Sequence, residues 1–150
     1  MARENDWLIG EYFVYAFDDV DGEVFSHPCS VTNPDGGDNL TVLWNFGPDF
    51  QYIGELSLRG DYFHMLSQRT NYEEFVFTIF PKPKTNYLNL VWGVAIGTIP
   101  RGNKPAIFRL VISRRQLSPG VLKQEFKRMN ATAQNSISVI DYDVEEKNRR

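Results

Sequence analysis

The side chains that most often carry chemistry are scarce in this sequence. It contains one cysteine and two histidines among 150 residues. A single cysteine excludes an intrachain disulfide and is typical of a reducing compartment. His27 and Cys29 share a strand face by their spacing, but a zinc site needs a third and a fourth ligand. We therefore expect no metal site, and we expect Cys29 to be a small buried strand residue rather than a nucleophile.

Long hydrophobic runs and targeting signals are absent as well. No apolar run approaches the ~18 residues that a membrane-spanning helix needs. The first ten residues lack the basic start and the apolar core of a secretory signal peptide. These features favour a cytoplasmic protein outside the membrane, and the length suits one domain that buries a real core.

Catalytic motifs are also missing. The sequence has neither a Gly-x-Ser-x-Gly elbow nor the Gly-Lys-Ser/Thr of a phosphate-binding loop. His64 lies in the middle of an apolar run, so we expect a strand residue that is hydrogen-bonded locally rather than a general base. No set of residues supports catalysis or a bound cofactor, and the sequence predicts a protein that is not an enzyme.

Acidic residues cluster at two places without a matching function. Residues 18–22, Asp-Asp-Val-Asp-Gly, suggest a calcium loop, but with Gly22 at its sixth position the twelfth would be Pro28 instead of glutamate. The second cluster, Glu73 and Glu74, precedes an apolar run. Carboxylates at turns and strand starts are easily solvated, so we interpret both clusters as solvated turns.

Aromatic and β-branched residues, by contrast, are plentiful and occur in short runs. Aromatic residues make up 14% of the chain, and such runs between turn residues are typical of β-strands. Eight runs recur at intervals of roughly ten residues, at 11–17, 23–32, 40–46, 50–58, 62–67, 74–80, 88–97 and 106–113. Because closure into a barrel removes sheet edges at this size, we predict an all-β, eight-stranded, up-and-down antiparallel barrel.

Glycine and proline refine this prediction. Gly10, Gly54, Gly93 and Gly97 lie inside predicted strands, where a residue without Cβ permits the sharp coiling of a small barrel. Pro28 confines the middle of the second strand to an edge or a bulge, because proline has no backbone N–H.

The last two runs form the most apolar hairpin, residues 87–115. Neither strand has a cleanly polar side, so each is either covered on both faces or lines a cavity. Arg109 interrupts the second of these strands. It either faces a cavity, where it needs a carboxylate, an anionic ligand or water, or lies outside along its aliphatic stem.

The hydrophobic period changes after this hairpin. Ser118 and Pro119 are a favoured N-cap and first helical residue, and the apolar residues that follow recur at helical spacing. We predict a helix over about 118–129 that packs on the barrel and completes a domain of residues 1–130.

The last stretch, residues 131–150, is interpreted separately from this domain. Its segment 136–142, Ser-Ile-Ser-Val-Ile-Asp-Tyr, is expected to be either a short strand or a peptide that docks on a partner. The residues after it are expected to form a charged tail.

Charge is divided unevenly along the chain. The net charge of −3 comprises −11 over residues 1–80 and +8 over residues 81–150. Either these charges decorate strand edges and loops, or cations gather at one end of the barrel and attract an anion. The second interpretation concerns six residues, Lys82, Lys84, Arg101, Lys104, Arg114 and Arg115. The negative net charge and the lack of interleaved aromatic and basic residues argue against nucleic acid as a partner.

The order of these elements resembles that of a known group of barrels. The opening Trp7-x-x-Gly10-x-Tyr12, followed by eight antiparallel strands and a helix, resembles the calycins, the lipocalin-like barrels. The stretches Leu56-x-Leu58-x-Gly60 and 93–106 are similar to sensory barrels of bacterial regulators and defence effectors, some of which bind cyclic nucleotides. This resemblance implies a barrel that binds a ligand, and it transfers no ligand residue position by position.

Together these observations predict a small-molecule-binding or sensory barrel with an anionic ligand such as a nucleotide. The residues expected at the ligand are Arg101, Lys104 and Arg109 for polar contacts, and Tyr12, Trp44 and Trp92 for an apolar wall. The alternative is a protein-interaction or oligomerisation module with a filled barrel. That module would bind a protein partner or a second copy through residues 136–142 or an exposed strand edge.

Overall fold

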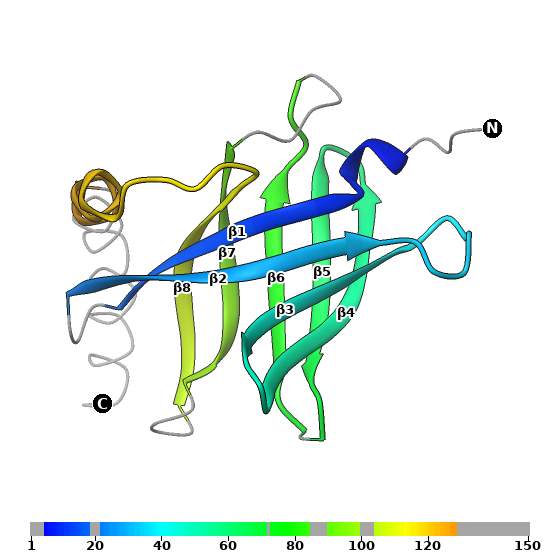
Figure 1. Cartoon of the computed structure of the whole chain (residues 1–150), viewed down its shortest axis with the longest axis horizontal. Helices are drawn as coiled ribbons and strands as arrows, with labels where there is room; N and C mark the ends of the chain where they lie inside the picture. The colour runs from blue at the N-terminus through cyan, green and yellow to red at the C-terminus, as the bar shows by residue number, and fades with distance from the viewer. Residues whose placement is uncertain (1–4, 19–21, 72, 85–89, 100–103, 129–150) are drawn as a thin grey trace, which may run out of the picture. The chain divides into compact units, whose positions relative to one another are not determined.

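A computed structural model describes residues 5–18, 22–71, 73–84, 90–99 and 104–128. The chain divides into two units, Met1–Gln116 and Leu117–Arg150, and each is described by itself. The first unit contains a 3₁₀ turn and eight strands (Figure 1): η1 (Asp6–Leu8), β1 (Gly10–Asp18), β2 (Glu23–Thr32), β3 (Leu40–Gly47), β4 (Phe50–Arg59), β5 (Tyr62–Arg69), β6 (Phe75–Pro81), β7 (Leu90–Ile99) and β8 (Lys104–Ser113).

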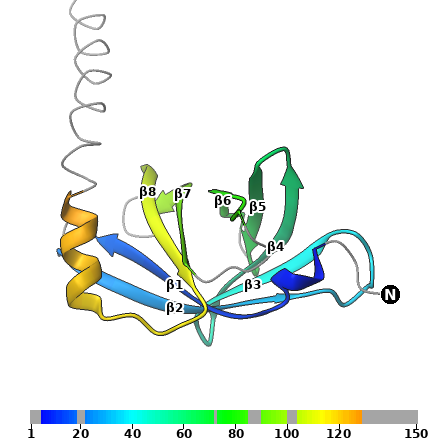
Figure 2. The same cartoon turned by 90° about the horizontal axis from the view of Figure 1, so that it is seen from above.

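The eight strands form a closed barrel in which each strand pairs with the next along the chain. All pairs are antiparallel, and β8 returns to β1 over four residue pairs, from Phe13–Ser113 to Ala16–Leu110. The strands curve around a shared interior (Figure 2). The predicted eight-stranded, up-and-down barrel is therefore confirmed.

Two prolines mark the places where neighbouring ladders stop. The β2–β3 ladder begins at Cys29, directly after Pro28, so residues 23–28 of β2 pair only with β1. The β6–β7 ladder covers three residue pairs and stops at Ile79–Val94, shortly before Pro81 ends β6. Because proline has no N–H to donate, neither residue extends a ladder on both sides. Pro28 thus lies at a local edge, as its chemistry predicts.

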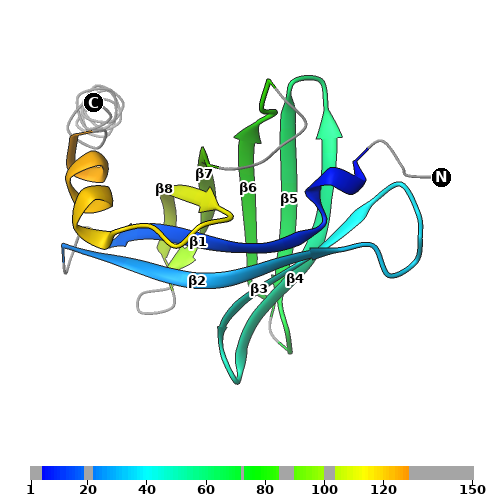
Figure 3. The same cartoon turned by 45° about the horizontal axis from the view of Figure 1, so that its top comes forward.

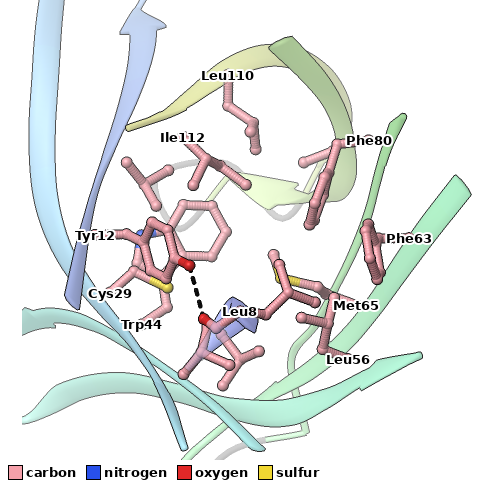
Figure 4. Close-up of a cluster of buried hydrophobic side chains, with 14 of the residues drawn as sticks. Leu8, Tyr12, Cys29, Trp44, Leu56, Phe63, Met65, Phe80, Leu110 and Ile112 are labelled. Carbon is pink, nitrogen blue, oxygen red and sulfur yellow. Dashed lines mark hydrogen bonds between the residues drawn. The ribbon is translucent and has the colours of Figure 1, made fainter. Parts of the chain in front are cut away.

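The interior of the barrel is filled with side chains. All eight strands contribute to one buried cluster, as does η1 through the fully buried Leu8. Figure 4 shows Tyr12, Trp44, Phe63, Phe80 and Leu110 pointing toward one another. An eight-stranded barrel is just wide enough either to be filled by side chains or to hold one small ligand. Here a hydrophobic core occupies that space.

The turn η1 closes one end of this core (Figure 3). The Tyr12 hydroxyl donates a hydrogen bond to the Leu8 carbonyl at 2.7 Å, and the Trp7 ring meets Phe63 edge-on at 5.9 Å. Arg114, which follows β8, donates from Nη2 to the Trp7 carbonyl at 2.7 Å. Its guanidinium lies 4.8 Å from the centre of the Tyr12 ring. Arg114 therefore ties the end of β8 to the cap and the start of β1.

Glycines in the barrel strands stand where a side chain has no room. A Cβ on Gly54 would collide with the Leu66 carbonyl oxygen of the neighbouring strand. A Cβ on Gly93 would lie 2.9 Å from the Ile79 carbonyl oxygen and 3.3 Å from Leu110. Both glycines let adjacent strands approach closely, as expected for a tightly coiled barrel.

The second unit contains one helix among its described residues, 119–128. The backbone N–H of Leu122 donates to the Ser118 carbonyl at 3.2 Å, which marks the first turn. Leu122 and Phe126 are buried, whereas Arg128 pairs with Glu125 at 2.9 Å on an exposed side. Packing of this helix on the barrel stays a prediction, and the predicted segment 136–142 lies outside the described residues. In the described chain no helix is both long enough and apolar enough to cross a membrane.

Candidate functional site

The six residues predicted to bind a ligand do not form one site. Tyr12 and Trp44 lie in the core, at 2% and 1% exposure. Trp92 and Arg109 lie on the outer face of β7 and β8, beside Val94 of β7. Lys104 is the first residue of β8, and Arg101 lies outside the described residues. The predicted apolar wall is therefore split, because strand alternation sends Trp44 inward and Trp92 outward.

The predicted gathering of cations at one end of the barrel is wrong for Lys104. Residues 82–84 follow β6 and residues 114–115 follow β8, so these lie at the end of the barrel where β7 begins. Lys104, the first residue of β8, lies at the opposite end, and Arg101 is not among the described residues. In an up-and-down barrel successive connections alternate between the two ends, which separates these groups. Arg114, moreover, is engaged with Trp7 and Tyr12.

The outer surface of β5–β8 carries an unusual concentration of apolar side chains. Cross-strand pairing places Leu66, Phe77, Ile96 and Ile107 in one row, and His64, Ile79, Val94 and Arg109 in the next. We call these eight residues the apolar face. Leu66, Ile96 and Ile107 are 54%, 47% and 68% exposed. Six of its eight members are hydrocarbon or aromatic side chains, whereas the water-facing side of an antiparallel sheet is usually polar.

His64 is the one imidazole in this face. Its ring stacks on Phe77 with centroids 5.9 Å apart and planes 19° apart. The expectation that His64 is hydrogen-bonded locally is wrong for Nδ1, a buried atom without a hydrogen-bond partner among the described residues. A buried polar atom that lacks a partner is costly unless something else supplies one.

A pocket of about 300 Å³ opens in the same surface, where the β6–β7 ladder stops. Its walls come from four strands and comprise Tyr62, Ile79, Phe80, Pro81, Trp92, Gly93, Val94 and Arg109. We call it the Trp92 pocket. Arg109 is half-buried there, and within the described part of the chain no carboxylate pairs with its guanidinium. The two alternatives for Arg109 resolve in favour of the exterior, and the pocket combines an indole, a phenol and a guanidinium.

A second group of aromatic and charged residues, at the opposite end of the barrel, is held together by an ion pair, a hydrogen bond and a cation–π contact. Arg69 Nη1 lies 3.1 Å from Glu74 Oε1, and its guanidinium lies 4.0 Å from the centre of the Phe50 ring. The Tyr52 hydroxyl donates to Glu74 Oε2 at 3.2 Å. Burial and the Glu74 charge raise the pKa of Tyr52 to about 12, so its proton is held. Glu74 is therefore an ion-pair partner rather than the solvated turn residue we expected.

Cys29 lacks the exposed thiolate that a nucleophile needs. It is buried in the core, and burial, with a smaller effect from the Glu11 charge, raises the pKa of its thiol to about 12. A thiol in that state is protonated at neutral pH and unreactive. Over the described ranges no group of three or more His, Cys, Asp or Glu is arranged to hold a metal ion.

Comparison with known proteins finds no match: no protein-family model, no curated protein and no solved structure is similar to this chain. The barrel agrees with the architecture that the calycin resemblance implies. The resemblance therefore rests on architecture alone, and the apolar face with its pocket is the feature that the geometry offers for function.

Proposed function

We propose that this protein is a protein-interaction module that binds its partner through the apolar face. The observation that carries the proposal is the exposed row from Leu66 to Ile107 on the outside of a barrel whose inside is already filled. Exposed apolar rows of this kind mark interaction sites on soluble proteins.

The energetics support a protein partner. Fully burying an exposed Leu or Ile contributes about 1.5–3 kcal/mol, so covering Leu66, Ile96 and Ile107 together drives binding. Trp92 and Arg109 stand at the margin of this row, and tryptophan and arginine are among the residues that dominate protein interfaces.

The filled interior weighs against a ligand inside the barrel. Tyr12 and Trp44, predicted to wall a cavity, pack against other core side chains. A ligand in that position would have to displace a well-packed core, which is strongly unfavourable.

The test is selection from a random peptide library displayed on phage. Full-length protein is the bait, and a variant with Leu66→Glu and Ile107→Glu is used for counter-selection. We expect enriched peptides that bind the wild type and lose at least about tenfold in affinity for the variant. The matched control is Val121→Glu, which changes a similarly exposed aliphatic residue of the helix over 119–128.

Circular dichroism of each variant first establishes that the fold is intact, which the exposure of these side chains favours. Peptides that bind wild type and face variant equally would reject the apolar face as the binding surface. A selection without any enriched peptide would reject the proposal as a whole.

A second candidate function is suggested by Arg109 beside Trp92. An indole that stacks on a base and a guanidinium that pairs with a phosphate suit an anionic aromatic ligand such as a cyclic or other nucleotide. A volume of about 300 Å³ lies at the lower end of the range for small-molecule sites. A sensory role, as in the bacterial barrels that this sequence resembles, would follow from such binding.

Isothermal titration calorimetry against a panel of nucleotides tests this candidate. Binding that disappears in Arg109→Ala would support it. Titrations that show no heat of binding for any nucleotide would reject the nucleotide-binding candidate and leave the protein-interaction function in place.

A further inference from the structure

The chain itself carries a segment whose chemistry matches the apolar face. Residues 136–146 contain five apolar side chains, Ile137, Val139, Ile140, Tyr142 and Val144, and four acidic ones, Asp141, Asp143, Glu145 and Glu146. The segment has no basic residue and a net charge of −4. Such a segment combines the hydrocarbon that would cover the row from Leu66 to Ile107 with carboxylates for a cationic margin.

The margin of the apolar face is cationic at the end that holds the Trp92 pocket. Arg109 belongs to the face, Arg59 pairs with Tyr62 of the pocket, and residues 82–84 follow Pro81 with two lysines. The acidic residues nearby are Asp61, in the turn after β4, and Glu55, opposite Leu66. The cations outnumber the carboxylates, so an acidic segment is the complementary partner.

The length of the segment fits the width of the face. An extended chain of seven residues spans about 23 Å, and the distance from β5 to β8 across three strand spacings is about 14 Å. Residues 136–142 therefore reach across all the strands that contribute to the face. Strands β5, β6 and β7 are paired on both sides within the barrel, so contact is made by side chains rather than by addition of a strand.

We propose that residues 136–146 of one copy bind the apolar face of a second copy. Because alternate side chains of an extended chain share one side, Ile137 and Val139 cover the exposed row, and the carboxylates of Asp141 and Asp143 on the same side face Arg109. This proposal rests on the proposed protein-interaction function and names its partner as the same protein.

Sedimentation velocity of the full-length chain over a concentration series gives the first test. We expect the wild type to associate as concentration rises. A tail variant, Ile137→Asp with Val139→Asp, and a face variant, Leu66→Glu with Ile107→Glu, are each expected to stay monomeric. An equimolar mixture of the two variants retains one intact tail and one intact face, so it should form a one-to-one dimer.

The second test measures binding of a labelled peptide with the sequence of residues 134–148 by fluorescence anisotropy. The receptor is the full-length tail variant, whose own segment does not compete. Ile107→Glu in this receptor should weaken binding at least about tenfold, and Arg109→Glu about fivefold. A peptide with Asp141→Lys and Asp143→Lys should regain affinity for Arg109→Glu, which a merely structural role of Arg109 does not explain.

Three outcomes would overturn the proposal. A peptide that does not bind excludes this segment as the occupant. Binding that the face variants do not weaken excludes the apolar face as its site. Peptide binding by the tail variant, together with a wild type that stays monomeric and refuses the peptide, would mean that no second copy is involved.

Failure of this inference is distinguishable from failure of the proposed function. If the phage selection enriches peptides that need the apolar face while the peptide of residues 134–148 does not bind, the face serves another protein. If neither binds, the protein-interaction function fails as well.

Discussion

The outside of the barrel differs sharply between β3–β4 and β5–β8. On β3 and β4, outward positions carry mostly polar side chains, with Thr41 opposite Glu55 and Asn45 opposite Gln51. On β5–β8, the corresponding rows are nearly all apolar. Both regions close the same core, which requires only one apolar side per strand. The second apolar side of β5–β8 is therefore not needed for folding, and this difference points to binding.

The largest effect on stability is expected from truncating a core leucine, and a leucine of the apolar face provides the matched comparison. Leu56→Ala removes a buried side chain from the core and should lower the free energy of unfolding by about 2–5 kcal/mol. Leu66→Ala, on the exposed apolar face, should change it by about 0.5 kcal/mol or less. Urea denaturation measures both. Equal losses would show that the face is part of the folding core and would undo the distinction.

A substitution at a point where two strands lie in close contact should lower stability nearly as much. Gly54→Ala places a methyl group against the backbone of Leu66 and Ser67, and we expect a loss of about 1–3 kcal/mol or more. Gly37→Ala is the control, because a Cβ there meets nothing within 4 Å. Thermal unfolding of both variants measures the effect. An unchanged unfolding temperature in Gly54→Ala would mean that β4 and β5 tolerate a wider spacing.

A smaller loss is expected at the capped end of the barrel. Arg114→Ala removes the hydrogen bond to the Trp7 carbonyl and the contact with the Tyr12 ring. We expect a loss of about 1–2 kcal/mol, because hydrogen bonds from charged donors exceed neutral ones. Arg115→Ala, at an exposed neighbour, should cost less. Chemical denaturation measures the free energy of unfolding of both variants. Equal losses would show that the contacts of Arg114 with Trp7 and Tyr12 do not stabilise this end of the barrel.

The smallest effect at neutral pH concerns the Cys29 thiol, and it grows with alkalinity. Its pKa is raised from 9.0 to about 12, so between these values the unfolded chain releases a proton that the folded chain holds. Stability from this source is complete below pH 9 and is lost as pH rises toward 12. Unfolding free energy from pH 8 to 11 should fall less steeply in Cys29→Ala. Rapid labelling of native Cys29 by a thiol reagent at pH 8 would contradict its burial.

The sequence predicts which residues form strands, but it does not reveal which side of each strand faces the core. Alternation along residues 88–97 separates Trp92 and Val94 from Gly93 and Ala95, but both sets are apolar. Volume decides between them: a Cβ on Gly93 would already meet Phe80 and Leu110. The barrel therefore takes the small residues of β7 inside and leaves the large ones outside, which single-strand alternation does not reveal.

His64 and Glu74 illustrate the same limit at the level of single side chains. Neighbours in the chain predict a local environment for each of these side chains, whereas its actual partner comes from another part of the strand order. Phe77 lies across β5–β6 from His64, and Arg69 lies across the β5–β6 turn from Glu74. Cross-strand partners depend on register, which a single strand does not contain.

The sequence by itself determined the number of strands, their order and their closure, because short apolar runs between tight turns leave an antiparallel barrel as the way to pair every strand. The tertiary structure alone decided which side of β5–β8 faces inward and that the cations lie at opposite ends. The physical reason is that inward volume and cross-strand register are properties of several strands at once. The apolar face arises from that choice: once small residues of β7 enter the core, its large ones meet the solvent or a partner.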